Sequence, residues 1–198
     1  MFIVERNVFL DFHIDTNRIN AKSCLKYMNI LERWYENDVI YIEMAEVAQN
    51  EAANRGSSLR SEKAYSYIAT ETLARTPDEF RMLRQIIEVL FPNGIKSTNE
   101  KNDVEIVFNA WKYGRILVTD DGGSKKQPGG ILGSRGKLST LGIKVLRDYE
   151  AVELVKEKII QRDQSALKVA SCKKDPIPQW VGKDLDVIKT FLKNEKES

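Results

Sequence analysis

The segment NDVEIVFNAWKYGRILVTDD, residues 102–121, changes its hydrophobic period half-way along, and this change decides the fold. Its first half is apolar at spacings of three and four residues, which predicts a helix of about three turns with Asn102 as N-cap. The apolar positions are Val104, Val107, Phe108 and Trp111. RILVT, residues 115–119, is a continuous apolar run that predicts a buried strand, and Asp120 and Asp121 follow it directly.

Other segments repeat this alternation of strands and helices. Apolar runs predict buried strands at 7–15, 39–42 and 142–146. Amphipathic helices are predicted after the first strand, from Thr76 as N-cap, and from Asp148. Parallel strands need crossover connections, which are usually helical. We therefore expect an α/β protein, a three-layer α/β/α sandwich with a central parallel sheet.

The chain length of 198 residues fits one domain of ordinary size with a short appendage. Residues 1–162 are expected to form this domain. The composition changes after residue 162, where two prolines and a turn precede a last amphipathic helix. We expect residues 163–198 to be a helical C-terminal extension docked on the domain, with a partner-binding arm as the alternative.

The overall composition narrows the class of protein. A net charge of +2 leaves any attraction to nucleic acid to local basic patches. No apolar run approaches the roughly 18 residues that span a bilayer, and the early charged residues argue against a signal peptide. We expect a cytoplasmic protein without a membrane partner. Cys24 and Cys172 are expected to be reduced, and His13 as the single histidine excludes the usual zinc sites.

Acidic residues fall at the carboxyl ends of the predicted strands, where open parallel sheets bind ligands. Asp15 ends the first strand, and Asp120 and Asp121 end the strand of the quoted segment. Asp103 lies in the first turn of its predicted helix, and Glu51 lies on the apolar side of the helix after the second strand. Converging carboxylates repel one another, so cations must neutralise them. Oxygen ligands suit Mg²⁺ or Mn²⁺, which support phosphodiester hydrolysis.

These residues carry a resemblance to a known family. The chain resembles the PIN-domain family in HIDTN at 13–17, in an acid on the helix after the second strand, and in the Asn-Asp and Thr-x-Asp of residues 102–121. Many small metal-dependent ribonucleases belong to this family, including toxin components of toxin–antitoxin pairs. The resemblance implies an endoribonuclease that uses Mg²⁺ or Mn²⁺ to hydrolyse RNA. An antitoxin or another protein partner, and a homodimer, are the assemblies it suggests.

Position by position, the resemblance implies a set of metal-binding and catalytic carboxylates. They are Asp15, Glu51, Asp103 and Asp121. Asp120 ends the same strand as Asp121 and is expected as an additional metal ligand, with Asp121 the better one. Thr119 and Asn17 would orient this set. The family's usual acid after the second strand falls near Gln49 here, so Glu46 is the alternative to Glu51.

The segment GGSKKQPGGILGSRGK, residues 122–137, is longer than in compact toxin members, as is the C-terminal tail, and both count against a toxin role. Its glycines lack P-loop spacing, because Ile131 stands where the first glycine is needed and Leu138 follows Lys137. We interpret the segment as a mobile flap beside the metal site. The expected nucleic-acid contacts are Arg18, Lys125, Lys126, Arg135 and Lys137.

Ordinary structural interpretations remain open for the same residues. Asp103 alone would complement a helix dipole, and Glu51 alone would be a solvated helix residue. Asp120 and Asp121 before two glycines would form a turn, and His13 is interpreted as a packed histidine. For the whole chain, the alternatives are a non-catalytic binding or regulatory module of the same fold, or a nuclease that acts on DNA flaps.

Overall fold

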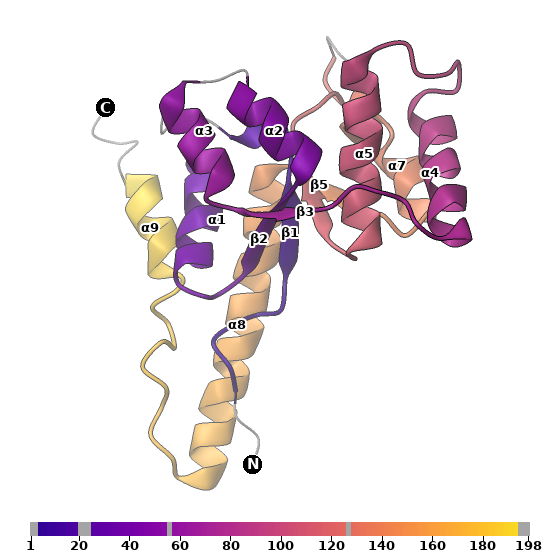
Figure 1. Ribbon diagram of the computed structural model, residues 1–198. Coiled ribbons are helices and arrows are strands. Elements are labelled where there is room, and N and C mark those ends of the chain that lie inside the picture. Colours follow the sequence, from indigo (N-terminus) through magenta and orange to yellow (C-terminus); the bar gives the residue numbers. More distant parts are fainter. Residues whose placement is uncertain (1–3, 20–24, 55–56, 126–127, 194–198) are drawn as a thin grey trace. The chain divides into compact units, whose positions relative to one another are not determined.

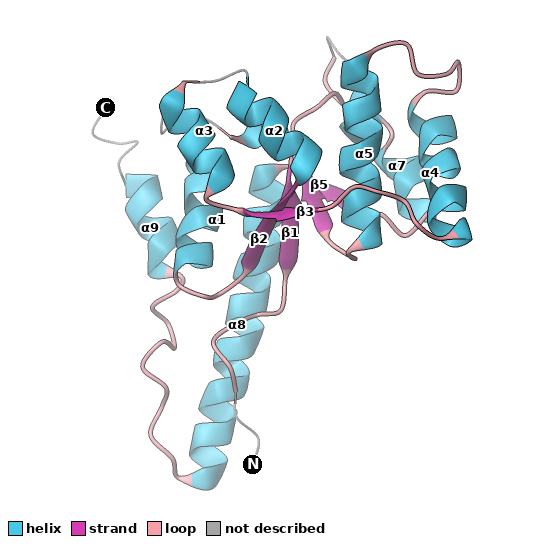
Figure 2. Ribbon diagram, in the orientation of Figure 1, coloured by secondary structure: helices cyan, strands magenta, loops and turns pink. Residues whose placement is uncertain are grey.

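The computed structural model describes residues 4–19, 25–54, 57–125 and 128–193 (Figures 1 and 2). These residues group into two compact units. The first, called the sheet unit, comprises the described residues of 11–24 and 42–147. The second, called the helical unit, comprises the described residues of 1–10, 25–41 and 148–198. Each unit is described by itself below.

Within the described residues, the sheet unit contains a five-stranded parallel sheet with the order β3-β2-β1-β4-β5. Its strands are β1 (Asp11–Ile14), β2 (Tyr41–Ala45), β3 (Ile68–Thr70), β4 (Ile116–Val118) and β5 (Val145–Leu146). Its helices are η1 (Thr16–Arg18), α2 (Glu46–Asn54), α3 (Ser58–Tyr65), α4 (Pro77–Leu90), α5 (Thr98–Lys112), α6 (Gly130–Gly133) and α7 (Arg135–Thr140). The expected α/β class with a central parallel sheet is confirmed.

Buried apolar side chains make β1 and β4 the centre of this sheet. Phe12 and Ile14 on β1 and Leu117 and Val118 on β4 are all at most 1% exposed. Ile14 pairs with Val118, so β1 and β4 end at the same level of the sheet. On one side of β1 the chain adds β2 and then β3, and on the other side it adds β4 and then β5. The strand order therefore reverses between β1 and β4, and open parallel sheets bind ligands at such a switch point.

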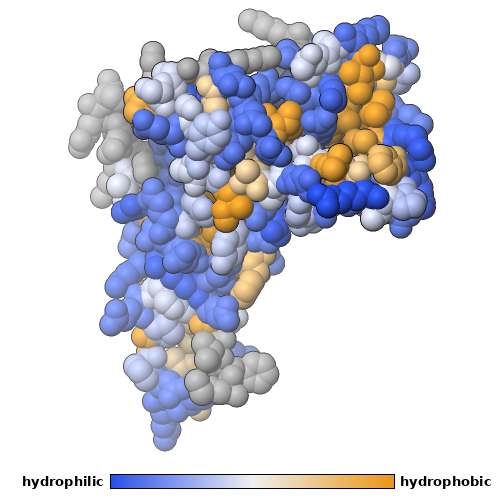
Figure 3. Space-filling view, viewed as in Figure 1, coloured by the Kyte–Doolittle hydropathy of each residue, from blue (hydrophilic) through white to orange (hydrophobic). Residues whose placement is uncertain are grey.

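Helix α5 packs against β4 and against α4. Helix α4 begins as predicted at Thr76, whose side chain forms a capping box with Glu79. Its apolar stripe is only partly covered, because Ile86 is its fully buried residue and Phe80 is 49% exposed. Figure 3 accordingly shows apolar surface over the α4 and α5 pair.

Several predicted boundaries are wrong for local reasons. The strand expected from residue 7 begins only at Asp11, because Phe9 adopts a left-handed backbone (φ 55°) and its N–H donates to the Asn7 side chain. The strand expected at 39–42 lies at 41–45, and β3 was not predicted. Helix α5 starts at Thr98 with Ser97 as N-cap, so Asn102 is not the cap.

The helical unit contains α1 (Lys26–Glu36), α8 (Asp148–Lys173) and α9 (Asp186–Lys193), with α1 packed on both others. The segment before α9 is fixed through Asp184, which is 2% exposed and pairs with Arg6 at 2.6 Å and Arg162 at 3.0 Å. The Asp184 carbonyl also accepts a hydrogen bond of 2.8 Å from the Trp34 indole. Helix α8 runs without a break through residues 162 and 163, where we expect the C-terminal extension to begin.

Two further expectations concern the whole chain. In the part of the chain that the structure describes, no helix has the length and apolar character needed to cross a membrane. Cys172 is a free and exposed thiol, whereas Cys24 lies outside the described residues.

Candidate functional site

Acidic side chains gather at the carboxyl edge of the sheet, where β1 and β4 end side by side. Asp15 follows β1 directly, and its N–H donates to the Val118 carbonyl at 3.0 Å. Thr119 follows β4, and its N–H donates to the Leu146 carbonyl at 3.0 Å. The ladder hydrogen bonds thus continue one residue past each strand and fix the backbone of both residues.

Asp15 is the most buried of these acids, with 4% of the residue exposed. Its Oδ2 accepts hydrogen bonds of 2.5 Å from the Thr119 hydroxyl and 2.5 Å from the Asn17 amide. The Thr119 Oγ1 in turn accepts a hydrogen bond of 2.9 Å from the Asp121 N–H. Thr119 and Asn17 therefore hold the Asp15 carboxylate in one orientation, and the supporting role predicted for them stays a prediction.

Burial and mutual repulsion raise the pKa values of two acids in this cluster. Burial raises the pKa of Asp15 to about 6, and the charges of Asp121 and Glu51 act in the same direction against the hydrogen bond from Thr119. Burial also raises the pKa of Asp103 to about 7, assisted by Asp121, Asp15 and Glu51. The structure thus brings Asp15, Glu51, Asp103 and Asp121 within electrostatic reach of one another, and we call these four residues the acid cluster.

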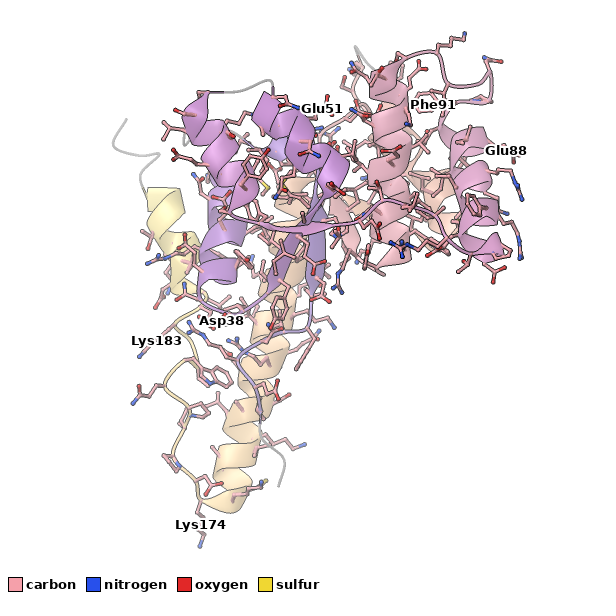
Figure 4. The ribbon with its side chains drawn as sticks, in the orientation of Figure 1. Asp38, Glu51, Glu88, Phe91, Lys174 and Lys183 are labelled. Carbon is pink, nitrogen blue, oxygen red and sulfur yellow. The ribbon has the colours of Figure 1, made fainter. Side chains whose placement is uncertain are left out.

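Glu51 on α2, labelled in Figure 4, is half-buried, whereas Glu46 at the start of the same helix is exposed. The Glu51 Oε2 accepts hydrogen bonds of 3.3 Å from the Thr16 hydroxyl and 3.4 Å from the Asn102 amide. Gln49, at the position where the family's acid was expected, is buried and donates to the carbonyls at the end of α3 and just beyond it. Of the two glutamates, the structure brings Glu51 to the acid cluster.

Asp103 reaches the cluster from the second turn of α5, not from the first turn as expected. The earlier start of α5 at Thr98 moves Asp103 away from the helix terminus. Its half-buried carboxylate therefore does not complement the helix dipole from the first turn of α5. Glu100 is the acidic residue of that turn, and it forms a capping box with Ser97.

Asp121 is shaped by the glycine-rich segment that follows it. Its Oδ2 accepts a hydrogen bond of 2.8 Å from the Ile131 N–H. Gly130 has φ 74°, and a Cβ there would collide with this same oxygen. The Asp121 carbonyl also accepts from the Leu132 N–H at 2.9 Å. Glycine at position 130 is thus required for the carboxylate of Asp121 to sit where it does.

The described part of residues 122–137 is hydrogen-bonded back to the strand end and contains α6 and the start of α7, whereas residues 126–127 lie outside the described residues. The expectation of a mobile flap stays a prediction. Arg135 and Lys137 lie on α7 and are exposed, as is Lys125. Lys126 lies outside the described residues. The predicted role of these side chains in contacting nucleic acid stays a prediction.

Asp120 differs from its neighbour Asp121 in its partners. Its carboxylate, 45% exposed, lies between the guanidinium groups of Arg18, at 3.3 Å, and Arg147. Arg147 follows β5 directly and was not predicted as a site residue. An arginine just after the predicted strand at 142–146 was the signal available in the sequence, because that position faces the same sheet edge.

The donor set fits Mg²⁺ or Mn²⁺ chemically, since the acid cluster offers oxygen ligands whose mutual repulsion a cation would relieve. Among residues 4–19, 25–54, 57–125 and 128–193, however, no three acidic, histidine or cysteine side chains are placed closely enough to hold one ion. An ion held by three or more of these carboxylates at once would require them to move toward one another, whereas one or two carboxylates with waters are a common set of Mg²⁺ ligands.

No protein-family model matches the chain, and no curated protein matches its sequence. Among solved structures, this protein is similar to a chain in the crystal structure of VapBC2 from Rickettsia felis bound to a DNA fragment from their promoter. The identity is 18%, the match covers 70% of this chain and 98% of that chain, and the TM-score is 0.43. Likeness at this level assigns neither a family nor a function to the chain.

Proposed function

We propose that the protein is a metal-dependent nuclease, an endoribonuclease that hydrolyses RNA phosphodiesters with Mg²⁺ or Mn²⁺. The observation that carries this proposal is the acid cluster itself, in which burial, together with the charges of neighbouring carboxylates from separate segments, raises the pKa values of Asp15 and Asp103. Such a cluster is unfavourable without a cation and is a frequent sign of a functional site. RNA is the substrate implied by the PIN-like motifs at 13–17 and 102–121.

Each residue of the cluster has a role that its contacts support. A bound Mg²⁺ or Mn²⁺ would supply a water of lowered pKa and stabilise charge on the phosphate. Asp15, held by Thr119 and Asn17, would present a fixed oxygen ligand. Asp121 is backed by the Ile131 N–H in the same way. Glu51 and Asp103 would complete the oxygen ligands from the two helices α2 and α5.

The test is cleavage of single-stranded and structured RNA by the purified protein in Mn²⁺ or Mg²⁺, with single-stranded and flap DNA as parallel substrates. Asp15→Asn and Glu51→Gln are expected to lower the rate at least about a hundredfold, the loss typical when a metal ligand is removed or misplaced. Glu46→Gln removes an exposed carboxylate from the same helix and should leave the rate unchanged. Cleavage that survives Asp15→Asn would overturn the proposal.

A second candidate is a non-catalytic binding module on the same fold. It is favoured because no three acidic, histidine or cysteine side chains among the described residues are placed to hold one ion together. Thermal unfolding in Mn²⁺ separates the two functions, because a ligand that binds the folded state raises its stability. Absence of stabilisation in the wild-type protein, together with absence of cleavage, would favour the binding module.

Protein partners are proposed on the resemblance alone. An antitoxin or another protein would be found by co-purification with the full chain. A homodimer would be found by its mass in solution.

A further inference from the structure

A cationic pair stands beside the acid cluster. Arg18 and Arg147 approach the Asp120 carboxylate from two sides, Arg18 through Nη2 to Oδ2 and Arg147 through Nη1 to Oδ1. The first arginine belongs to η1 and the second follows β5, so 129 positions of sequence separate them. Only the folded sheet unit places both at one carboxylate.

Both guanidinium groups are held by partners other than Asp120. The Arg18 Nε donates to the Asn17 Oδ1 at 2.9 Å. The Arg147 Nη2 contacts the carbonyl oxygens of Gly122 at 3.3 Å and Gly123 at 3.5 Å. The two cations are therefore pre-positioned by groups that would remain if the Asp120 carboxylate turned away.

The Asp120 side chain is more exposed than those of the two arginines. Its side chain is 45% exposed, whereas those of Arg18 and Arg147 are 10% and 25% exposed. An ion pair with an exposed carboxylate contributes little stability, because water screens the charges and the side chain loses freedom. An anion that matches two guanidinium groups better than a carboxylate can therefore replace it, and a phosphate group does so through bidentate hydrogen bonds.

We propose that Arg18 and Arg147 form a subsite for a backbone phosphate of a nucleic acid, and that Asp120 occupies this subsite in the free protein. This proposal rests on the proposed function, because the bound phosphate would belong to the same nucleic-acid strand whose scissile phosphate lies at the acid cluster. Asn17 links the two places, since its amide donates to Asp15 while its Oδ1 accepts from Arg18 and from the Asp120 N–H. The subsite therefore holds a phosphate that neighbours the scissile one.

The subsite answers an electrostatic difficulty of the acid cluster. Carboxylates repel a polyanion at long range, so a strand would not approach them without compensating charge. The two arginines supply that charge at the rim of the cluster. In the free protein Asp120 masks this positive charge. Binding of a nucleic-acid phosphate therefore depends on displacement of the exposed Asp120 side chain.

The experiment measures binding of a fluorescent single-stranded oligoribonucleotide in EDTA, where no metal chemistry takes place. Arg147→Gln should weaken binding and reduce the slope of log affinity against log salt by about 0.7, the value for one phosphate contact of a single strand. Asp120→Asn should strengthen binding up to about fivefold, as expected when one exposed ion pair no longer competes.

Glu71 and Arg75 provide matched controls, because they form an exposed ion pair of 2.7 Å elsewhere in the sheet unit. Glu71→Gln and Arg75→Gln make the same changes of charge and should alter affinity far less than Asp120→Asn and Arg147→Gln. In the Arg147→Gln background, Asp120→Asn should lose the part of its effect that comes from Arg147 and keep the part that comes from releasing Arg18.

The proposal is overturned if Asp120→Asn and Glu71→Gln change affinity equally, or if Arg147→Gln leaves the salt slope unchanged. Thermal unfolding checks each variant, and Asp120→Asn decides alone if Arg147→Gln fails to fold. Changed binding in EDTA without cleavage in Mn²⁺ would retain the subsite and reject the nuclease. Cleavage with an unaltered salt slope would do the reverse.

Discussion

Asp103→Asn is expected to make the metal-free protein more stable at pH 8. Burial, together with the charges of Asp121, Asp15 and Glu51, raises the pKa of Asp103 from 3.8 to about 7. One pKa unit corresponds to about 1.4 kcal/mol, so this rise amounts to roughly 4 kcal/mol of destabilisation once the carboxyl is ionised. Because Asp103 is partly exposed and its repulsion is shared among several acidic neighbours, we expect a gain of about 2 kcal/mol from asparagine.

The sign follows from proton linkage. The folded protein binds the Asp103 proton more tightly than the unfolded chain, so the stability from this group is fully present below pH 3.8 and is lost as the pH rises through about 7. The advantage of Asp103→Asn should therefore fall toward zero as the pH approaches 4. His13, whose pKa burial lowers, and Glu43, whose pKa the His13 hydrogen bond chiefly lowers to about 2, act in the opposite direction. Both are present in either protein, so the difference between the two proteins isolates Asp103.

The assay is urea unfolding in EDTA at several pH values between 4 and 8, with Asp78→Asn as the control. Asp78 is an exposed carboxylate in the first turn of α4, and its removal should give no comparable gain. Added Mn²⁺ should reverse the order at pH 8 by stabilising the wild-type protein more than the variant. An Asp103→Asn protein that is no more stable than the wild type at pH 8 in EDTA would refute the reasoning.

Two further predictions concern packing. Gly130→Ala should cost about 1–2 kcal/mol of stability and weaken Mn²⁺ binding, because residue 130 has a positive φ and the added Cβ would displace the Asp121 carboxylate. As the control, Gly136→Ala on α7 should be tolerated, because its Cβ would meet nothing within 4 Å. Asp184→Asn in the helical unit should cost about 3 kcal/mol by leaving buried arginine charge uncompensated, whereas Asp186→Asn at an exposed pair should be nearly neutral. Chemical denaturation of each pair of variants checks both; equal stability within either pair would contradict the assignment.

Long elements with caps were predictable, and the choice between competing caps was not. The capping box of Thr76 and Glu79 fixed the start of α4 correctly. The same motif at Ser97 and Glu100 begins α5, but Asn102 is also a good N-cap residue, so the local pattern alone could not choose between them. The earlier start releases the Asn102 side chain to contact Glu51.

Short elements escaped prediction because their stability comes from tertiary contacts. Strand β3 has three residues and an exposed Ile68 at the edge of the sheet, so it lacks the apolar run of a central strand. Helix α6 begins and ends with glycine, a poor helix former, and its position depends on hydrogen bonds to Asp121. Such elements are specified by what they pack on.

The site divides in the same way. Asp15, Thr119 and Asp121 follow strand ends, so the positions of these residues could be predicted from local pattern and the rule for parallel sheets. The different partners of Asp120 and Asp121 could not be predicted in this way. They depend on Arg147, which contacts Asp120 only when β5 lies beside β4. Local sequence identifies which acids reach the edge of the sheet, and the strand order decides which of them are neutralised by arginine.

The neutralised and the unneutralised acids have different physical consequences. Asp120 stands between two guanidinium groups, so its charge is compensated within the protein. Asp15 and Asp103 have raised pKa values because they are buried and lie near other carboxylates. Without a cation, the folded protein would therefore be more stable with neutral side chains at both positions. Among the described residues, the carboxyl groups with raised pKa values, Asp15 and Asp103, are two of those that the proposed function requires, and the gain in stability expected for Asp103→Asn measures how much a bound cation has to offset.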